Sequence, residues 1–353
     1  MKHLLPLIFV ILVSAQVSGQ KPESENRTFT NPIFPSGADP WIIWKDGYYY
    51  YTNTSGSRLF LRKAKNIDDL KTSEQRTIWT PPAGTAYSKE IWAPELHFIQ
   101  GKWYIYFAAD DGFNRNHRMY AVENPSPDPT EGTWELKGKV SDPSDKWAID
   151  GSVFEFRDKR YMIWSGWEGD VDGQQNIYIA GMKNPWTIGG DRVLISAPEY
   201  DWEKNGDLNR VEAPHVNVNE GPVTLTLRNK LFLIYSASGC WTDFYCLGML
   251  TFSGKDNPLD AASWKKNPFP VFKSKPESGV FAPGHNCFFL SPDGKEQWIL
   301  YHANSAPGQG CGRFRSPRIQ KFTLKRDGSP DFGEPLSTDI RLAFPSEGRQ
   351  MGK

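Results

Sequence analysis

Five segments of the chain repeat one pattern of apolar and polar positions. Each opens with a polar residue beside Pro or Gly, continues as an apolar run, turns tightly, and returns as a second run rich in aromatic and β-branched residues. This pattern predicts a β-hairpin. The segments are Asp39–Thr54, Ala93–Asp110, Asp150–Trp167, Glu220–Ser238 and Pro283–Asn304, with turns at Lys45-Asp46-Gly47, Gln100-Gly101-Lys102, Arg157-Asp158-Lys159, Arg228-Asn229-Lys230 and Asp293-Gly294-Lys295.

The spacing of the hairpins predicts the fold. Their openings lie about 55 to 70 residues apart, with no amphipathic helix between them. A repeat of that length built from strands is typical of a propeller whose blades have four strands. We therefore expect an all-β fold, a five-bladed β-propeller of four-stranded antiparallel blades, formed as one domain by residues 20–353. A β-sandwich is the alternative, but sandwiches do not repeat one hairpin signature five times. The tail from Arg341 either closes the ring or extends from it.

The first 19 residues have a composition of their own. Lys2 and His3 precede the apolar run Leu4–Val13, and small and polar residues follow up to Gly19. This pattern predicts a secretory signal peptide over residues 1–19, and the apolar run is too short to span a bilayer. We expect a secreted or periplasmic protein with no membrane association after removal of the signal.

Charge excludes one class of partner. The chain has 41 Lys and Arg and 41 Asp and Glu, so its formal net charge is zero, and no run of basic residues interrupts this balance. Because binding to a phosphate backbone depends on clustered positive charge, we expect no nucleic-acid partner.

Four cysteines are present, and export would allow them to form disulfides. Four cysteines allow three pairings, and the sequence does not choose among them. The spacing of Cys240 and Cys246 suits a bridge that closes a loop around Trp241, while Cys287 and Cys311 stand apart. None of these spacings suits a zinc site.

The openings of the repeats carry the candidate chemistry. The innermost strands of a propeller line its central channel, so equivalent positions converge on the axis. Asp39, Asp150 and Glu220 stand at three openings, and the other two supply Glu95 and His285. Carboxylates that face each other raise the pKa of at least one of them. A protonated acid opposite an ionised one is the pair that glycoside hydrolysis requires, so three matching acids favour catalysis over ordinary turn chemistry.

A calcium cage is a competing use of converging carboxylates. The local sequence lacks the alternating Asp and Asn ligands of a calcium loop, and the absence of an HExxH motif disfavours catalytic zinc. No cofactor is required, and a structural Ca²⁺ ion on the axis stays open, with His285 as the residue that would hold an ion or a water there.

Tryptophans are candidate platforms for a sugar, because a sugar ring offers an apolar face to an indole. Trp92 precedes the second opening, Trp41 follows Asp39, and Trp167 ends the third repeat. Most tryptophans of a propeller pack between blades. Trp92 is favoured as a platform because it lies directly before an inner-strand opening.

These residues stand in a series of short motifs that resembles glycoside hydrolase family 43, five-bladed propeller enzymes that act on arabinose- and xylose-containing polymers. The motifs span residues 31 to about 335, nearly the whole mature chain. They are Asp39-Pro40, Trp92-Ala93-Pro94-Glu95, Ala148-Ile149-Asp150-Gly151, Asn219-Glu220-Gly221-Pro222 and Pro283-Gly284-His285-Asn286.

The resemblance implies an inverting mechanism. Asp39 would be the general base, Glu220 the general acid, and Asp150 the residue that raises the pKa of the acid and orients it. An arginine from the last blade would bind the sugar, for which we choose Arg315 over the nearby Arg318, and His285 matches a histidine associated with an axial ion or water. Substrate-binding candidates are Trp92, Glu95, Trp41, Trp167 and Arg315.

Within the family the chain most resembles α-L-arabinofuranosidases, including enzymes that act from the chain end on α-1,5-arabinan. The implied partner is a plant cell-wall polysaccharide or oligosaccharide, arabinan or arabinoxylan. A β-xylosidase or an endo-arabinanase on the same scaffold stays an alternative, because pocket walls and loops set the substrate. A propeller that binds glycans without cleaving them is a further alternative, but it would not need three acids.

Overall fold

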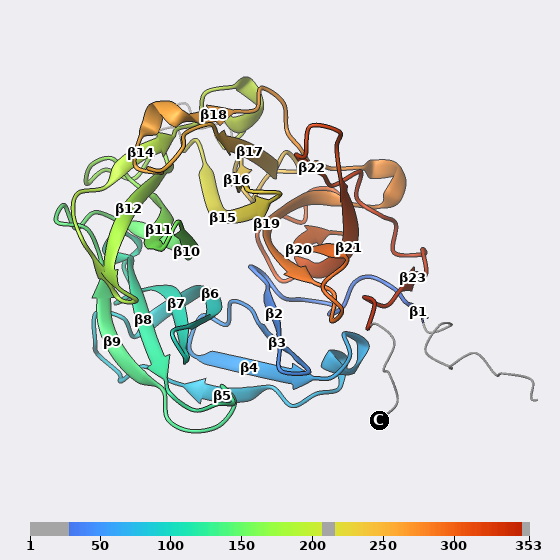
Figure 1. Ribbon diagram of the computed structural model, residues 1–353, viewed down its shortest axis with the longest axis horizontal. Coiled ribbons are helices and arrows are strands. Elements are labelled where there is room, and N and C mark those ends of the chain that lie inside the picture. Colours follow the sequence, from blue (N-terminus) through green and yellow to red (C-terminus); the bar gives the residue numbers. More distant parts are fainter. Residues whose placement is uncertain (1–27, 207–215, 348–353) are drawn as a thin grey trace, which may run out of the picture.

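The computed structural model describes residues 28–206 and 216–347, so the predicted signal peptide over residues 1–19 lies outside the described part. Within those two ranges the chain is almost entirely β-structure and forms five blades around a central axis (Figure 1). The helices there are short 3-10 turns, and none is long and apolar enough to cross a bilayer. They are η2 (Asp68–Lys71), η3 (Asn114–Asn116), η4 (Asp201–Glu203), η5 (Ala261–Ser263) and η6 (Pro276–Ser278).

The prediction of five antiparallel blades is confirmed, and each blade is one continuous stretch of chain. The first blade is β2 (Trp41–Lys45), β3 (Tyr48–Thr52), β4 (Leu59–Ala64) and β5 (Arg76–Trp79). The second is β6 (Lys89–Ile99), β7 (Lys102–Asp110), β8 (Arg118–Asn124) and β9 (Glu135–Val140). The third is β10 (Ala148–Phe156), β11 (Lys159–Gly166), β12 (Asn176–Asn184) and β13 (Thr187–Ile188), with β14 (Val193–Ser196) also paired to β12.

The remaining two blades follow the same order. The fourth is β15 (Asn219–Leu227), β16 (Lys230–Ala237), β17 (Cys246–Phe252) and β18 (Trp264–Lys266). The fifth is β19 (Phe281–Leu290), β20 (Gln297–Asn304), β21 (Ser316–Leu324) and β22 (Pro330–Asp331). In every blade the predicted hairpin is the inner pair of strands.

The hairpin turns explain why these segments fold back where they do. In four of them both central residues have positive φ, as at Asp46 (51°) and Gly47 (84°). Two consecutive residues of this kind form the turn whose twist matches that of antiparallel strands. The others are Gln100-Gly101, Arg157-Asp158 and Arg228-Asn229.

The hydrophobic core lies between neighbouring blades. Successive side chains of a strand point to opposite faces of its sheet, so each blade contributes to two core layers. On β16, Leu231 and Leu233 pack toward the third blade, whereas Phe232 and Ile234 pack toward the fifth. The same alternation gives one buried cluster between each adjacent pair of blades.

The two ends of the described chain meet beside the fifth blade. β1 (Thr28–Phe29) pairs with β23 (Leu342–Ala343), so the tail helps to close the ring (Figure 1). The Asn31 amide then donates to the carbonyl of Ile319 and accepts from its N–H, at 2.8 and 2.9 Å. Within residues 28–206 and 216–347 the ring is thus fastened by packing and by this junction, and no strand there is exchanged between the first and last blades.

Candidate active site

Four of the five inner strands share one irregularity at the same end of the propeller. In the second to fifth blades, two residues of the inner strand oppose a single residue of the next strand, which is a β-bulge. The first bulge residue has positive φ, and Asp39 adopts the same conformation just before β2. The five equivalent positions are Asp39, Ala93, Asp150, Gly221 and His285.

The expectation that three acids occupy equivalent positions is therefore wrong for Glu220, which precedes its bulge by one residue. Gly221 takes the bulge position with φ of 53°. A Cβ there would lie 3.2 Å from Nδ1 of His285, so a larger residue would press on that ring. Glu95 is displaced in the other direction, two residues beyond Ala93, and is buried.

Asp39 is held from three sides. Its Oδ2 accepts a hydrogen bond of 2.6 Å from the Thr54 hydroxyl, and its Oδ1 accepts one of 3.1 Å from Nη1 of Arg315. Nδ1 of His285 lies 3.4 Å from the same Oδ1. The backbone N–H of Asp39 donates to Nδ1 of His302 at 3.1 Å. These contacts join the first blade to the fifth around one carboxylate.

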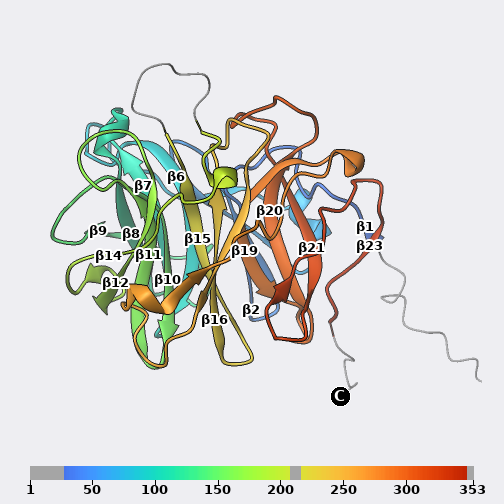
Figure 2. The ribbon, with the colours of Figure 1, turned by 90° about the horizontal axis from the view of Figure 1, so that it is seen from above.

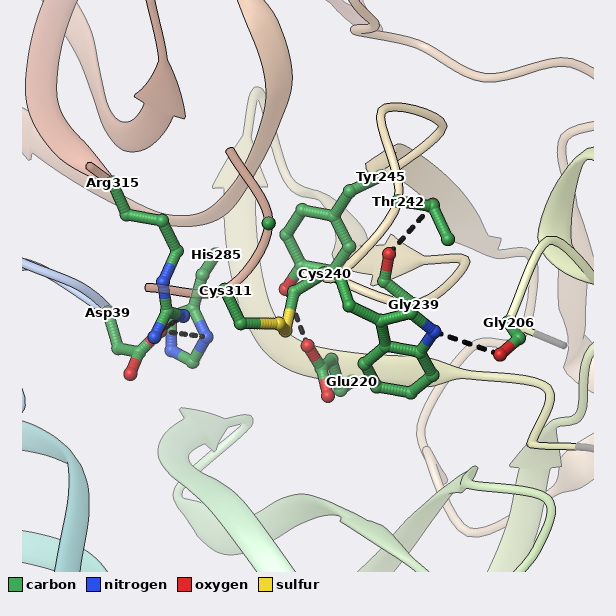
Figure 3. Close-up of a disulfide and its surroundings, with 12 residues drawn as sticks. Asp39, Gly206, Glu220, Gly239, Cys240, Thr242, Tyr245, His285, Cys311 and Arg315 are labelled. Atoms are coloured by element: carbon green, nitrogen blue, oxygen red, sulfur yellow. Dashed lines mark hydrogen bonds and ion pairs between the residues drawn. A yellow bond between two sulfur atoms is a disulfide. The ribbon is translucent and has the colours of Figure 1, made fainter. Parts of the chain in front are cut away.

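Asp150 and Glu220 form the other half of the site. Oδ2 of Asp150 accepts from the N–H of Gly221 at 3.0 Å, which ties the third blade to the fourth. Oε1 of Glu220 accepts from the Tyr245 hydroxyl at 2.7 Å (Figure 3). Nδ1 of His285 lies 4.0 Å from Oδ2 of Asp150, between the two halves.

The surroundings separate the acids into an ionised and a protonated group. Burial alone would raise the pKa of Asp39, but Arg315, the two histidines and the Thr54 hydroxyl together hold it well below its usual range. Burial raises the pKa of Glu220 to about 7, and Asp39 adds to this while the Tyr245 hydroxyl opposes it. At weakly acidic pH the site therefore holds an ionised carboxylate opposite a carboxyl that keeps its proton, and near neutral pH a large fraction of molecules are still in this state.

Asp150 itself has a raised pKa, in addition to its expected effect on the pKa of Glu220. Burial, followed by the charge of Glu220, raises the pKa of Asp150 well above its usual value. Two buried carboxyl groups that repel each other titrate as a pair. The raised pKa is thus a property of both Asp150 and Glu220, not of Glu220 alone.

A cavity of about 640 Å³ opens above these acids. Its walls include residues from connections between the second and third strands of the blades, and from segments between blades that hold Trp147, Gly206 and Val216. The connections between second and third strands lie at one end of the propeller (Figure 2). Asp39, Asp150, Glu220, His285 and Arg315 all line it, so the structure brings these five predicted residues together. The other lining residues are Thr54, Trp92, Asn114, Trp147, Ile149, Asp172, Gln175, Gly206, Val216, Cys240, Trp241 and Cys311.

Of the three tryptophans predicted to bind the sugar, only Trp92 lines the cavity. Trp92 lines the cavity and stacks on His117 with ring centroids 4.0 Å apart. Trp167 is buried behind Trp147, stacked on it at 4.6 Å, so Trp147 and not Trp167 faces the cavity. Trp41 lies outside this cavity and lines a separate one. Its indole N–H donates to the carbonyl of Leu96.

Glu95 and Arg318 also lie apart from the cavity lining. Glu95 is buried, with Oε2 2.9 Å from Nε2 of His97. Burial raises the pKa of Glu95 and lowers the pKa of His97 to about 3, so both groups are neutral. Arg318 is fully buried and hydrogen-bonded to Ser305.

The described residues do not support the structural Ca²⁺ ion considered for the propeller axis. Residues 28–206 and 216–347 contain no group of three or more His, Cys, Asp or Glu side chains arranged to hold a metal ion. Nδ1 of His285, the residue expected to hold such an ion, is directed at Asp39 and Asp150.

The suggested loop between Cys240 and Cys246 is also wrong. Cys240 forms a disulfide with Cys311, and Cys246 and Cys287 are buried free thiols. Cys246 begins β17 and is enclosed within the blade, whereas Cys240 lies in the connection before it and faces the fifth blade. Sequence spacing alone could not show this, because 71 residues separate the paired cysteines.

Several further residues complete the site, and of these the sequence analysis named only Trp241, in the loop after Cys240. Thr54 and His302 position Asp39, Tyr245 contacts Glu220, and Trp147 and Trp241 line the cavity. Thr54 ends the first repeat and His302 lies in the fifth, so a comparison of the repeat ends could have suggested these two. Tyr245 and Trp241 lie in a connection without a repeated pattern.

A five-bladed propeller with an ionised carboxylate opposite a carboxyl pair that retains a proton, in one cavity, has the apparatus of a glycoside hydrolase. The sequence model of glycosyl hydrolases family 43 matches residues 29–330, and the chain belongs to this family.

Relatives within the family are similar over most of their length. The chain is 37% identical over 344 residues to an extracellular exo-α-(1→5)-L-arabinofuranosidase of Streptomyces avermitilis, covering 95% of this chain and 69% of the relative. It is 39% identical over 280 residues to the protein of the same name from Streptomyces chartreusis, covering 78% and 82%. The crystal structure of an α-L-arabinofuranosidase from Lactobacillus brevis superposes with a TM-score of 0.80 at 38% identity, covering 88% and 98%.

Proposed function

We propose that this protein is a secreted, inverting exo-α-L-arabinofuranosidase that releases terminal arabinofuranose from α-1,5-linked arabinan. The observation that carries the proposal is the division of charge in the cavity, with Asp39 ionised and the Asp150–Glu220 pair retaining a proton. The names and similarity of the relatives support the choice of sugar and of action from the chain end.

In the proposed mechanism Asp39 is the general base. Its carboxylate removes a proton from a water molecule that attacks the anomeric carbon of the terminal arabinofuranose. Thr54 and Arg315 fix the carboxylate, and the positive charge of Arg315 keeps it ionised. Arg315 also lines the cavity, so we assign it a second role in binding the sugar.

Glu220 is the proposed general acid. It donates its proton to the glycosidic oxygen as the bond to the anomeric carbon breaks, so the released chain leaves as an alcohol. Asp150 holds the backbone of Gly221, next to the acid, and the repulsion between the two carboxyl groups opposes loss of the last proton of the pair. Trp92 is the proposed platform for the sugar; we propose no platform role for Trp41 or Trp167.

The proposed substrate is a polysaccharide or oligosaccharide of the plant cell wall. The Asp150–Glu220 side of the cavity carries Trp241, and connections of the second and third blades add Asn114 and Asp172. Walls on several sides suit a chain end better than the middle of a polymer. We further propose that residues 1–19 are a signal peptide and that residues 20–353 form the single catalytic domain. The disulfide and the extracellular relatives support this location.

Hydrolysis of two aryl glycosides tests the proposal, with product analysis on linear arabinan. We expect turnover of the aryl α-L-arabinofuranoside and release of arabinose alone from arabinan, both abolished in Asp39→Asn. Preference for the aryl β-D-xyloside would instead indicate a β-xylosidase, and arabino-oligosaccharide products an endo-arabinanase. Binding of arabinan without turnover of any substrate would indicate a glycan-binding propeller.

A further inference from the structure

Two surface connections from different blades are tied together beside the cavity. One runs between β16 and β17 of the fourth blade, and the other between β20 and β21 of the fifth. The Cys240–Cys311 disulfide joins them with a Cα–Cα distance of 5.2 Å. The Asp243 carboxylate makes a second tie, because its two oxygens accept from the N–H of Gly308 at 2.9 and 3.0 Å.

The connection between β16 and β17 is itself held by hydrogen bonds to residues that follow η4 and β18. The Trp241 indole N–H donates to the carbonyl of Gly206 at 2.9 Å, and the N–H of Gly239 donates to the carbonyl of Asn205 at 2.9 Å. The Ser274 hydroxyl donates to the carbonyl of Asp243 at 2.8 Å. Because the β16–β17 connection is held in this way, the disulfide can restrain the β20–β21 connection against it.

Arg315 lies four residues after Cys311 and is the last residue of the β20–β21 connection. Between them, residues 312–314 are exposed, and the N–H of Arg315 makes a long bond of 3.4 Å to the carbonyl of Gly312. The guanidinium nevertheless reaches Asp39, with Nη1 3.1 Å from Oδ1. In Figure 3 the disulfide lies, in this view, between the group of Asp39, His285 and Arg315 and the Glu220 side of the site.

The other contacts of this segment do not fix the side chain. The carbonyl of Arg315 accepts from the N–H of Gly37 at 2.9 Å, which sets the backbone at the start of β21. Among the described residues, Nε of Arg315 is buried without a hydrogen-bond partner. On the N-terminal side of Arg315 the connection is attached at Gly308, through Asp243, at Gly310, whose carbonyl accepts from the Asn304 amide at 3.0 Å, and at Cys311. Of these attachments Cys311 is the nearest to Arg315 and the covalent one.

We propose that the Cys240–Cys311 disulfide is a positioning element that holds Arg315 against Asp39, so that full hydrolytic activity requires the oxidised protein. The proposal rests on the proposed function, in which Asp39 is the base and Arg315 its partner. It assigns a catalytic consequence to a bond that lies outside all five blades, between two cysteines that take part in no strand pairing.

Reduction of the folded protein tests the proposal directly. Tris(2-carboxyethyl)phosphine supplies two electrons, the sulfur–sulfur bond breaks into two thiols that take up two protons, and the phosphine becomes its oxide with the oxygen of water. All four cysteines lie in the described part, and the other two are free thiols, so this is the one bond that the reagent can break.

Two readouts separate positioning from general stability. We expect kcat/KM for the aryl arabinofuranoside to fall about 10- to 100-fold on reduction, the size of effect that a displacement near 1 Å has on catalytic groups. The acidic limb of the pH–rate profile should move about one unit to higher pH, because Asp39 loses part of its interaction with a positive charge. Far-ultraviolet circular dichroism should stay unchanged.

Variants provide the controls. Cys240→Ser/Cys311→Ser should reproduce the reduced protein and no longer respond to the phosphine, while Cys246→Ala should behave as the wild type in both states. Asp243→Ala removes only the second tie and should move both readouts in the same direction by less. If the double variant fails to fold, reduction of the purified wild type decides the question.

The possible outcomes are distinct. Unchanged kcat/KM and pH profile after reduction would overturn the proposal, and unfolding on reduction would contradict it by assigning the bond to global stability. Hydrogen–deuterium exchange of residues 305–315 should increase on reduction, and this readout does not depend on any substrate. If deuterium exchange at residues 305–315 increases on reduction as expected, but the oxidised wild type does not hydrolyse arabinofuranosides, the proposed function is refuted. The positioning role of the disulfide would then still hold.

Discussion

The phenolic hydroxyl of Tyr245 donates a hydrogen bond of 2.7 Å to Oε1 of Glu220, and Tyr245 immediately precedes β17. This hydrogen bond favours the ionised form of Glu220, whereas burial favours the protonated form. The balance leaves the pKa of Glu220 at about 7, well above that of an ordinary carboxyl group and close to the pH at which a general acid works best.

Tyr245→Phe should shift this balance. Without the donor, the ionised carboxylate is less stable, so the pKa of Glu220 should rise and the alkaline limb of kcat/KM should move up by about half to one pH unit. We also expect kcat to fall about tenfold, because the acid loses its orientation. Tyr301→Phe is the control, since Tyr301 is equally buried but bonds to Gln320 away from the cavity. An alkaline limb that does not move would rule out this role of Tyr245.

Asp150→Asn should move the same limb in the opposite direction. Repulsion between Asp150 and Glu220 is mutual, so removing one charge lowers the pKa of the other group. The asparagine keeps an oxygen that can accept from the N–H of Gly221. We expect the alkaline limb to shift to lower pH and kcat to decrease about 10²-fold. If the limb stays in place while kcat falls, Asp150 orients the site without tuning the acid.

Glu220→Gln should stabilise the fold in a pH-dependent way. The pKa of Glu220 is about 7 in the folded protein and 4.5 as its ordinary value, so folding favours the protonated form. The wild type therefore loses stability as the pH rises from about 4.5 to 7, and the glutamine variant avoids this loss. The difference in unfolding free energy should be near zero at pH 4 and up to about 3 kcal/mol at pH 8. Chemical unfolding at both pH values measures it, and an equal difference at the two would contradict the assignment.

Trp92→Ala should weaken substrate binding more than it slows the chemical step. Trp92 lines the cavity and its ring is held by His117, so it offers a fixed apolar surface to a sugar. Loss of one such contact should raise KM about 2- to 10-fold. Trp41→Phe serves as the control, because Trp41 lies outside this cavity, and it should leave both constants unchanged. The reverse pattern would place the platform at Trp41.

The sequence predicted the blades because the necessary information is local. Alternating apolar residues define each strand, and pairs such as Asp46-Gly47 and Arg228-Asn229 adopt the positive φ that a two-residue hairpin turn needs. Fivefold repetition then implies the ring. Convergence of Asp39 and Asp150 follows from that symmetry, because both adopt positive φ at the equivalent point of their blades, Asp39 just before β2 and Asp150 in the bulge of β10.

The remaining features depend on contacts between blades, which no local pattern encodes. A bulge shifts the side-chain alternation by one residue, so Glu220 faces the site from a position that differs from that of Asp39. The directions of Trp41 and Trp167 depend on packing against His97 and Trp147, respectively. Tyr245 and the partner of Cys240 lie in connections whose paths are set by neighbouring loops.

The stereochemistry of the first product tests the central claim most directly. Proton NMR during the earliest turnover of linear arabinan, with Asp39→Asn as the inactive control, identifies the anomer before it equilibrates. Direct attack by a water that Asp39 activates, on the face opposite Glu220, predicts β-L-arabinofuranose as the first and only product. First appearance of the α-anomer would contradict the assignment of Asp39 as the base, and release of oligosaccharides would contradict action from the chain end.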